Sequence, residues 1–140
     1  MNTHIGYTEA QFAVRLPATP RGARQARLLA VGQLRSWGLP VEGPGLIVGE
    51  LAANAVTHGR VPGRGFQVVL TRGAKVLRIE VVDTRGDRVA SLRDAGPGAE
   101  GGRGLVLVAA LADRWGVEPG LPPCKAVWAE VDLSGEGLKP

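Results

Sequence analysis

The sequence predicts an α+β fold: a two-layer α/β sandwich in which a mostly antiparallel sheet is covered by helices on one face. Three observations lead to this class. Two strand-like segments are joined through Gly73-Ala74 as a hairpin, several segments of helical periodicity each carry one apolar face, and a hydrophobic fraction of 44% is enough for one core. The 140 residues fit a single domain, with its core over about residues 10–133.

The N-terminal third is expected to form a strand and then a helix. Residues 11–17 alternate apolar and polar side chains, which is typical of a strand. A helix follows from Pro20, with Thr19 as its N-cap, and ends at Gly38. We expect the buried stripe of this helix to be Leu28, Val31 and Leu34.

The remaining elements follow in the order helix, strand, strand, glycine-rich loop, helix, strand. The second helix begins near Pro44 and reaches Thr57 or His58, with Gly59 as its stop. Its expected apolar face is Ile47, Val48, Leu51, Ala52, Ala55 and Val56. The strands are expected at 66–72, 75–83 and 124–133, the loop at 84–104 and the third helix at 104–115.

Composition excludes several classes of function. The net charge is +4, but the arginines are dispersed and aromatic residues make up only 4%, which disfavours nucleic-acid binding. The same basic surface suits an acidic protein partner or simply keeps the protein in solution. Cys124 is the only cysteine, which excludes an intrachain disulfide and a cysteine-rich zinc site. Without a signal peptide or an apolar run of membrane-spanning length, we expect a cytoplasmic protein with no membrane partner.

Glu50, Asn54 and His58 recur at intervals of four, so they lie on one line along the second helix. Asn54 offers a neutral carbonyl oxygen suited to Mg²⁺, which substrate phosphates usually complete. Glu50 is placed to deprotonate a hydroxyl or water beside those phosphates. An ordinary solvated helix face would show the same pattern, and His58 is equally explained as a cation at a helix C-terminus.

Two further segments contain residue types that bind nucleotides. Asp83 ends an apolar strand, where its carboxylate can accept a hydrogen bond from the amine of an adenine, and Gly86 lets the backbone approach a base. A turn-forming aspartate is the alternative. Residues 98–115 lead from glycines into a helix N-terminus, which favours phosphate, with Arg103 adding charge. A flexible loop before an ordinary helix explains them equally.

In their order along the chain, these segments resemble the GHKL ATPase superfamily, whose nucleotide-binding unit is the Bergerat fold. ELAANAVTHG is similar to the N box, VVDTRGD stands where the G1 box belongs, and GGRGLVLVAALADRWGV is similar to the G2 box and the helix after it. The branch that the chain resembles is that of the bacterial anti-sigma factor serine/threonine kinases and their stand-alone ATP-binding relatives.

The resemblance implies a role for each matching residue. Glu50 matches the catalytic base, Asn54 the magnesium-binding asparagine and Asp83 the aspartate that reads the adenine amine. The remaining nucleotide contacts are expected from Gly86, Gly102, Arg103, Gly104 and Leu105. ATP and Mg²⁺ are the implied cofactors.

Two functions follow from the resemblance. The first is a serine/threonine protein kinase that phosphorylates an anti-sigma-factor antagonist, with that antagonist or a sigma factor as partner and a homodimer as a possible assembly. The second is a non-catalytic protein-binding regulator with weak or no ATP binding. The second is favoured by Arg85, which stands where the fuller G1 pattern has glycine, and the first by the presence of both Glu50 and Asn54.

Overall fold

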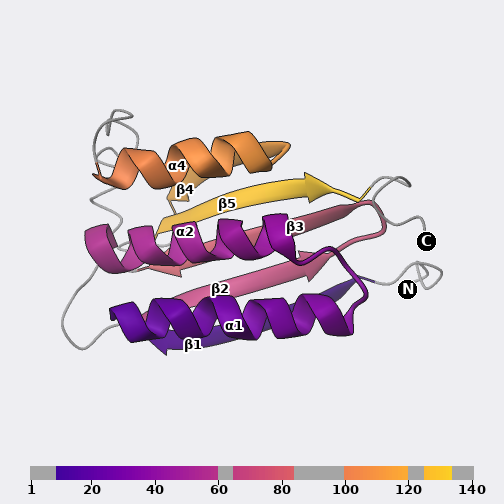
Figure 1. Ribbon diagram of the computed structural model, residues 1–140, viewed down its shortest axis with the longest axis horizontal. Coiled ribbons are helices and arrows are strands. Elements are labelled where there is room, and N and C mark those ends of the chain that lie inside the picture. The colour runs from indigo at the N-terminus through magenta and orange to yellow at the C-terminus, as the bar shows by residue number, and fades with distance from the viewer. Residues whose placement is uncertain (1–8, 60–64, 84–99, 120–124, 134–140) are drawn as a thin grey trace.

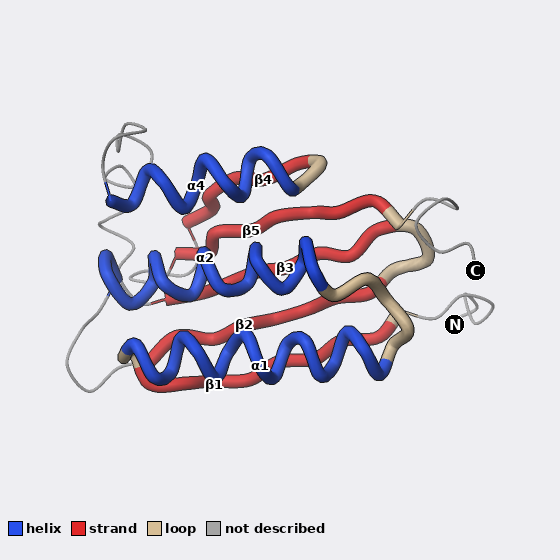
Figure 2. The backbone as a smooth tube through the Cα atoms, in the orientation of Figure 1, coloured by secondary structure: helices blue, strands red, loops and turns tan. Residues whose placement is uncertain are grey.

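The computed structural model describes residues 9–59, 65–83, 100–119 and 125–133. The elements are β1 (Ala10–Pro17), α1 (Pro20–Ser36), α2 (Glu42–Gly59), β2 (Gly65–Arg72), β3 (Val76–Asp83), α4 (Glu100–Leu111), β4 (Arg114–Pro119) and β5 (Lys125–Asp132). The strands form one sheet in the order β1-β2-β3-β5-β4, and every neighbouring pair is antiparallel. The helices of the described residues, α1, α2 and α4, lie side by side on one face of this sheet, with α2 in the middle (Figures 1 and 2). The predicted two-layer α+β sandwich is confirmed.

Helix α1 begins and ends where the sequence predicts, but a different stripe is buried. The Thr19 hydroxyl accepts a hydrogen bond from the Gly22 N–H at 2.9 Å, and the left-handed Gly38 (φ 74°) follows the helix end. The expected stripe is wrong at Leu28, which is 71% exposed. The buried residues recur at intervals of four: Gly22, Ala26, Ala30 and Leu34. Small side chains along this line let the helix pack closely against the layer below it.

Helix α2 buries all six of its predicted apolar residues and lies close against α1. The close approach depends on Gly45 and Gly49. A Cβ atom at Gly45 would lie 3.0 Å from the side chain of Val31, and one at Gly49 would lie 3.3 Å from the Cδ of Arg27. The aliphatic stem of Arg27 therefore covers Gly49, directly beside Glu50.

The hairpin of β2 and β3 is confirmed, and Gly73 closes its turn by donating its N–H to the Val76 carbonyl at 2.8 Å. The predicted third helix is wrong at both ends. It begins at Glu100 and ends at Leu111, and the segment from Arg114 forms strand β4. Pairing with β5 explains the change, because it satisfies the backbone groups of a segment that sequence periodicity alone assigns to the helix.

The core lies between the helices and the sheet. Its largest fully buried apolar side chains come from α1, α2 and the central strands: Phe66, Leu34, Ile47, Leu51, Leu70, Leu77 and Ile79. Alternate residues of β2 and β3 point into this core, as the period of two requires.

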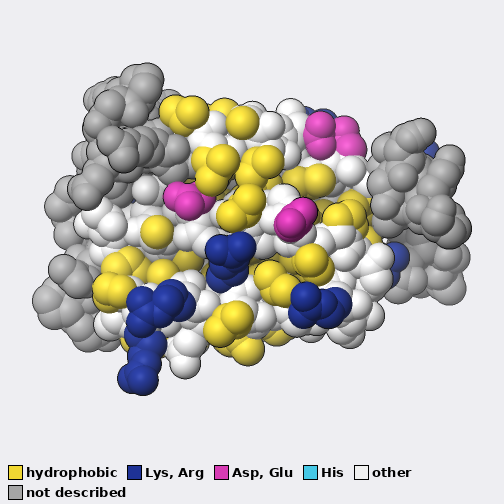
Figure 3. Space-filling view, in the orientation of Figure 1, with side chains coloured by type: hydrophobic (Ala, Val, Ile, Leu, Met, Phe, Trp, Pro, Cys, Tyr) yellow, Lys and Arg dark blue, Asp and Glu magenta, His cyan; other side chains and the backbone are white. Residues whose placement is uncertain are grey.

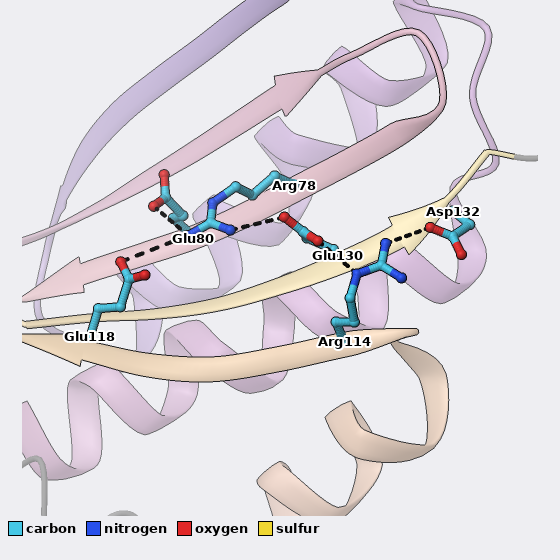
Figure 4. Close-up of polar contacts among 6 residues, drawn as sticks. All are labelled: Arg78, Glu80, Arg114, Glu118, Glu130 and Asp132. Atoms are coloured by element: carbon cyan, nitrogen blue, oxygen red, sulfur yellow. Dashed lines mark hydrogen bonds and ion pairs between the residues drawn. The ribbon is translucent and has the colours of Figure 1, made fainter.

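The opposite face of the sheet has a network of ion pairs that links β3, β4 and β5 (Figure 4). Arg78 contacts Glu130 at 3.0 Å and lies 4.5 Å from the centre of the Trp128 ring. Arg114 contacts Glu130 at 2.8 Å and also pairs with Asp132. Each arginine bridges carboxylates of more than one residue, and such charge-assisted contacts tie neighbouring strands together through their side chains.

This network makes stability depend on pH through Glu130. The hydrogen bond from Arg114 lowers the pKa of Glu130, burial opposes the shift, and Arg78 adds to it. Because the folded-state pKa is lowered, the contribution is present above the ordinary glutamate pKa of about 4.3 and is lost as pH falls through the lowered value. We expect Glu130→Gln to lose about 1 kcal/mol near neutral pH in urea unfolding.

The difference between Glu130→Gln and the unchanged protein should vanish in acid. The control is Glu118→Gln, because Glu118 is 57% exposed and lies 3.8 Å from Arg78. A loss of stability in Glu130→Gln that stays constant from neutral to acid pH would contradict the assignment.

Candidate functional site

The predicted site residues lie on elements that meet at one end of the molecule. Helix α2 contacts α1, α4 and β3. Its C-terminal half, the last residues of β3, the first residues of β5 and the start of α4 lie at the left end of the view in Figure 1. Residues far apart in the sequence therefore meet around the second half of α2.

Asn54 is the first notable group at this end. Its side chain is buried, with 7% of the residue exposed, and its Nδ2 has no hydrogen-bond partner in the part of the chain that the structure describes. A buried amide without an acceptor costs about 1–3 kcal/mol, so native proteins rarely leave one unpaired without a reason. A ligand oxygen beside Asn54 would supply the acceptor.

Glu50 lies one helical turn before Asn54 and is half-buried. Within the described part of the chain, no ion pair or side-chain hydrogen bond involves its carboxylate. Glu50 and Asn54 are thus two neighbouring oxygen-bearing groups that the protein does not use for its own structure.

Glu50 also lines a groove of about 330 Å³ between α1 and α2. Arg24 and Arg27 of α1 stand on the opposite wall, and Ala53 and Thr57 of α2 complete the side next to Glu50. On this face, basic side chains gather over α1, and acidic ones lie over α2 and near the C-terminal end of α4 (Figure 3). The volume is at the lower end of the range for small-ligand sites, and the two arginines favour an anionic group.

Arg24 and Arg27 are site residues that the sequence motifs do not indicate. The two arginines are three residues apart, so they lie on one face of α1. This spacing indicates, from the sequence alone, that they can act together. Which helix face meets α2 depends on the packing at Gly45 and Gly49, and that packing is visible only in the structure.

Asp83 is the last residue of β3 and is 4% exposed, on the face of the sheet that the helices cover. Lys125, the first residue of β5, stands opposite it in the strand register. The Lys125 Nζ lies 3.6 Å from the Asp83 Oδ2, and Lys125 is only 1% exposed. Sequence analysis missed Lys125, although its alternation with Val127 and Ala129 places it on the buried face of β5.

The other predicted site residues are less fully described. Gly86 lies outside the described residues, and of Gly102, Arg103 and Gly104 only the backbone is described, within the first turns of α4. The same holds for His58 in α2. Leu105 is 6% exposed and packs in the core. The structure thus places Glu50 and Asn54 on the helix that packs over the strand carrying Asp83, while the predicted phosphate-side contacts stay predictions.

Comparison with known proteins identifies the family. The model of the histidine kinase-like ATPase domain matches residues 16–129. The chain belongs to the histidine kinase-like ATPase family. This confirms the resemblance to the GHKL superfamily, and membership in a family of ATPases implies ATP binding.

A solved structure shows the same fold as this ATPase domain. The crystal structure of the RsbU and RsbW domains of Rv1364c from Mycobacterium tuberculosis matches with a TM-score of 0.64 and 20% sequence identity. The match covers 89% of this chain and 32% of that chain, so this ATPase domain spans about a third of the solved chain's length. A comparison with curated proteins finds no match.

Two further observations concern metal-type side-chain clusters and membrane-spanning helices. In the described residues of this ATPase domain, no group of three or more histidine, cysteine, aspartate or glutamate side chains is arranged to hold a metal ion. Among the described helices, none is both long and apolar enough to cross a bilayer.

Proposed function

We propose that this protein is a cytoplasmic, ATP- and Mg²⁺-dependent serine/threonine kinase of the anti-sigma-factor type, with the ATPase domain over residues 1–140. Its protein substrate is an antagonist of an anti-sigma factor, and the regulated partner is a sigma factor. The observation that carries the proposal is the pair of Glu50 and Asn54, one turn apart on α2, which the described protein leaves without side-chain partners. Membership in the ATPase family supplies the nucleotide.

The chemistry of this pair fits a magnesium–phosphate ligand. Asn54 presents an amide whose oxygen suits Mg²⁺ and whose unpaired Nδ2 suits a phosphate oxygen. When bound, Mg²⁺ supplies positive charge that offsets the charge on the phosphates. An ion held by one or two protein oxygens and completed by phosphates needs no cluster of three acidic or histidine ligands.

The proposed reaction uses Glu50 as a general base. Its carboxylate accepts the proton of a serine or threonine hydroxyl, and the hydroxyl oxygen bonds to the γ-phosphorus of ATP. The bond from the γ-phosphorus to its bridging oxygen breaks, and that oxygen leaves with ADP. Arg24 and Arg27, across the groove from Glu50, form a positive wall that suits an acidic protein substrate near the same carboxylate.

Other parts of the proposal rest on the family and on the resemblance. Asp83 is proposed to accept a hydrogen bond from the adenine amine, and Gly86, Gly102, Arg103, Gly104 and Leu105 to complete the nucleotide site. The structural likeness to the RsbU and RsbW domains supports the fold. The anti-sigma branch and a homodimer as the assembly are proposed from the sequence resemblance.

Isothermal titration with ATP, with and without Mg²⁺, tests the proposal through Asn54. We expect the unchanged protein to bind ATP in the micromolar range, with about tenfold weaker binding when Mg²⁺ is removed, which corresponds to about 1.4 kcal/mol. Asn54→Ala should bind ATP with the same affinity with and without Mg²⁺, because the proposed protein ligand of the metal is removed.

Gln25→Ala is the matched control, since it removes an exposed helical amide from α1 and should keep the magnesium dependence. Magnesium dependence that survives in Asn54→Ala would refute the metal role of Asn54. No binding of ATP by the unchanged protein would refute the kinase and favour the alternative, a non-catalytic regulator that binds protein alone.

A further inference from the structure

The face of the sheet that points away from the helices has an apolar centre. The helices of the described residues all lie on the other face, so no described helix covers this one (Figures 1 and 2). The apolar side chains at its centre are all partly exposed: Val69, Val82, Ala126 and Trp128. A sheet face of this kind is stabilised when a second apolar surface packs on it.

Trp128 is the largest of these side chains, and Gly116 of the neighbouring strand makes room for its ring. A Cβ atom at Gly116 would lie 2.9 Å from the Cζ2 of Trp128. The ring therefore extends over β4 at a point where that strand has no side chain. Arg78 lies 4.5 Å from the ring centre and restrains the indole further. The indole is thus held in place with part of its surface exposed.

The two edges of this face carry opposite charges. Arg15 of β1 and Glu118 of β4 lie at the two ends of one row across the sheet. The strand register connects them through Gln67, Val82 and Ala126. Four strand spacings, about 19 Å in all, separate the two residues, so they are too far apart to pair within one chain.

Neither of these edge residues is held tightly by the protein itself. Both are exposed; Arg15 makes no ion pair with the described residues, and Glu118 makes only a contact of 3.8 Å with Arg78. The charges nearer the middle are already paired, since Arg78 lies 3.4 Å from Glu80 and 3.0 Å from Glu130. The face therefore offers one positive and one negative edge to a partner, with apolar side chains between them.

We propose that this face is the interface with a second copy of the chain. A two-fold axis parallel to the strands and along β3 turns the second sheet over, so that β1 of one copy lies on β4 of the other. Arg15 of each copy then lies against Glu118 of the other, and Val69 packs on Trp128 across the interface. An axis perpendicular to the strands would place each edge on its own copy, which separates Arg15 from Glu118.

The inference rests on the homodimer of the proposed function, to which it assigns a surface, and it needs neither ATP nor phosphoryl transfer. Glu50 and Asn54 belong to the helical layer on the other side of the sheet. Two copies joined through their sheets therefore present both candidate sites outward, where a protein substrate can reach them.

Charge reversal at the two edges tests the interface by sedimentation velocity. Arg15→Glu and Glu118→Arg are each compared with the unchanged protein over a range of concentrations at low ionic strength. We expect the unchanged protein to form a dimer and each variant to dimerise about tenfold more weakly, because two-fold symmetry brings the like charges together twice. An equal mixture of the two variants should dimerise as the unchanged protein does, since opposite charges then meet at both contacts.

Arg35→Glu is the matched control. It reverses the same charge on the exposed side of α1, in the helical layer, and should leave dimer formation unchanged. Circular dichroism shows whether each variant is folded. The mixture adds an independent check, because a chain that had lost its fold would not regain a partner.

The outcomes separate the interface from the proposed function. If each variant dimerises as strongly as the unchanged protein, the homodimer stands but uses another surface. If the folded variants fail to dimerise in the mixture, the pairing of Arg15 with Glu118 is wrong. If the unchanged protein stays a monomer throughout, the homodimer and its interface are both wrong, while ATP binding, which titration measures separately, is unaffected.

Discussion

Glu50→Gln should lower the rate of ADP formation by about 100- to 10,000-fold, the range typical for loss of a general base. Glutamine keeps the size and polarity of the side chain, so it preserves the packing beside Gly49 and the groove. It cannot take a proton from a hydroxyl or water. Because Glu50 makes no ion pair or side-chain hydrogen bond with the described residues, its replacement should cost little stability.

The measurement pairs turnover with binding. Transfer of the label from γ-labelled ATP to water or to protein is followed for the purified protein, with and without a bacterial lysate as a source of phosphate acceptors, and ATP affinity is titrated separately. We expect ATP affinity to stay within about threefold of the unchanged protein, which is below 1 kcal/mol. Loss of affinity with turnover per bound ATP unchanged would show that Glu50 binds substrate and is not the base.

Glu42→Gln is the control for this prediction. Glu42 lies in the first turn of the same helix, is exposed, and does not line the groove. Its replacement removes one carboxylate and a small favourable interaction with the helix dipole, about 0.5 kcal/mol. Turnover should therefore be unchanged. This result would show that the loss in Glu50→Gln comes from the position of that carboxylate and not from a change in the net charge of α2.

Asp83→Asn should weaken ATP binding by about 10- to 100-fold, which corresponds to the loss of a charge-assisted hydrogen bond of about 1.5–3 kcal/mol. The amide keeps the shape of the carboxylate but turns one acceptor into a donor, which faces either the adenine amine or Lys125. GTP, which has no amine at the equivalent ring position, should be affected much less. Titration with both nucleotides gives the comparison.

Asp132→Asn serves as the control for Asp83→Asn. Asp132 is the last residue of β5, is exposed, and pairs with Arg114 on the opposite face of the sheet. Its amide variant should bind ATP and GTP as the unchanged protein does. If Asp83→Asn weakens ATP and GTP equally, the residue supports the fold of the site and does not read the base.

Much of the architecture follows from local sequence patterns. Three features depend only on residues close together in the sequence: the cap at Thr19, the apolar face of α2 and the hairpin closed at Gly73. Local sterics, capping and periodicity determine such features without reference to the rest of the chain. The family is predicted separately, from the resemblance of three segments to the N, G1 and G2 boxes in their order along the chain.

Which helix faces and which strands meet depends on the packing of the whole chain. Leu28 has the same helical spacing as a core residue but is exposed, because α1 packs through its small residues at intervals of four. Strand β4 forms because its backbone groups pair with the edge of β5. The sequence at residues 114–115 has no strand pattern and would by itself continue the preceding helix.

The candidate site divides in the same way. The spacing of Glu50 and Asn54 by one helical turn is predictable from the sequence, since the helical repeat requires it. Helix packing determines that the Asn54 Nδ2 has no partner among the described residues and that two arginines lie across the groove from Glu50. Strand register determines that a buried lysine lies beside Asp83. Periodicity determines which side of an element a residue occupies, but only the assembled layers determine which side chain it meets there.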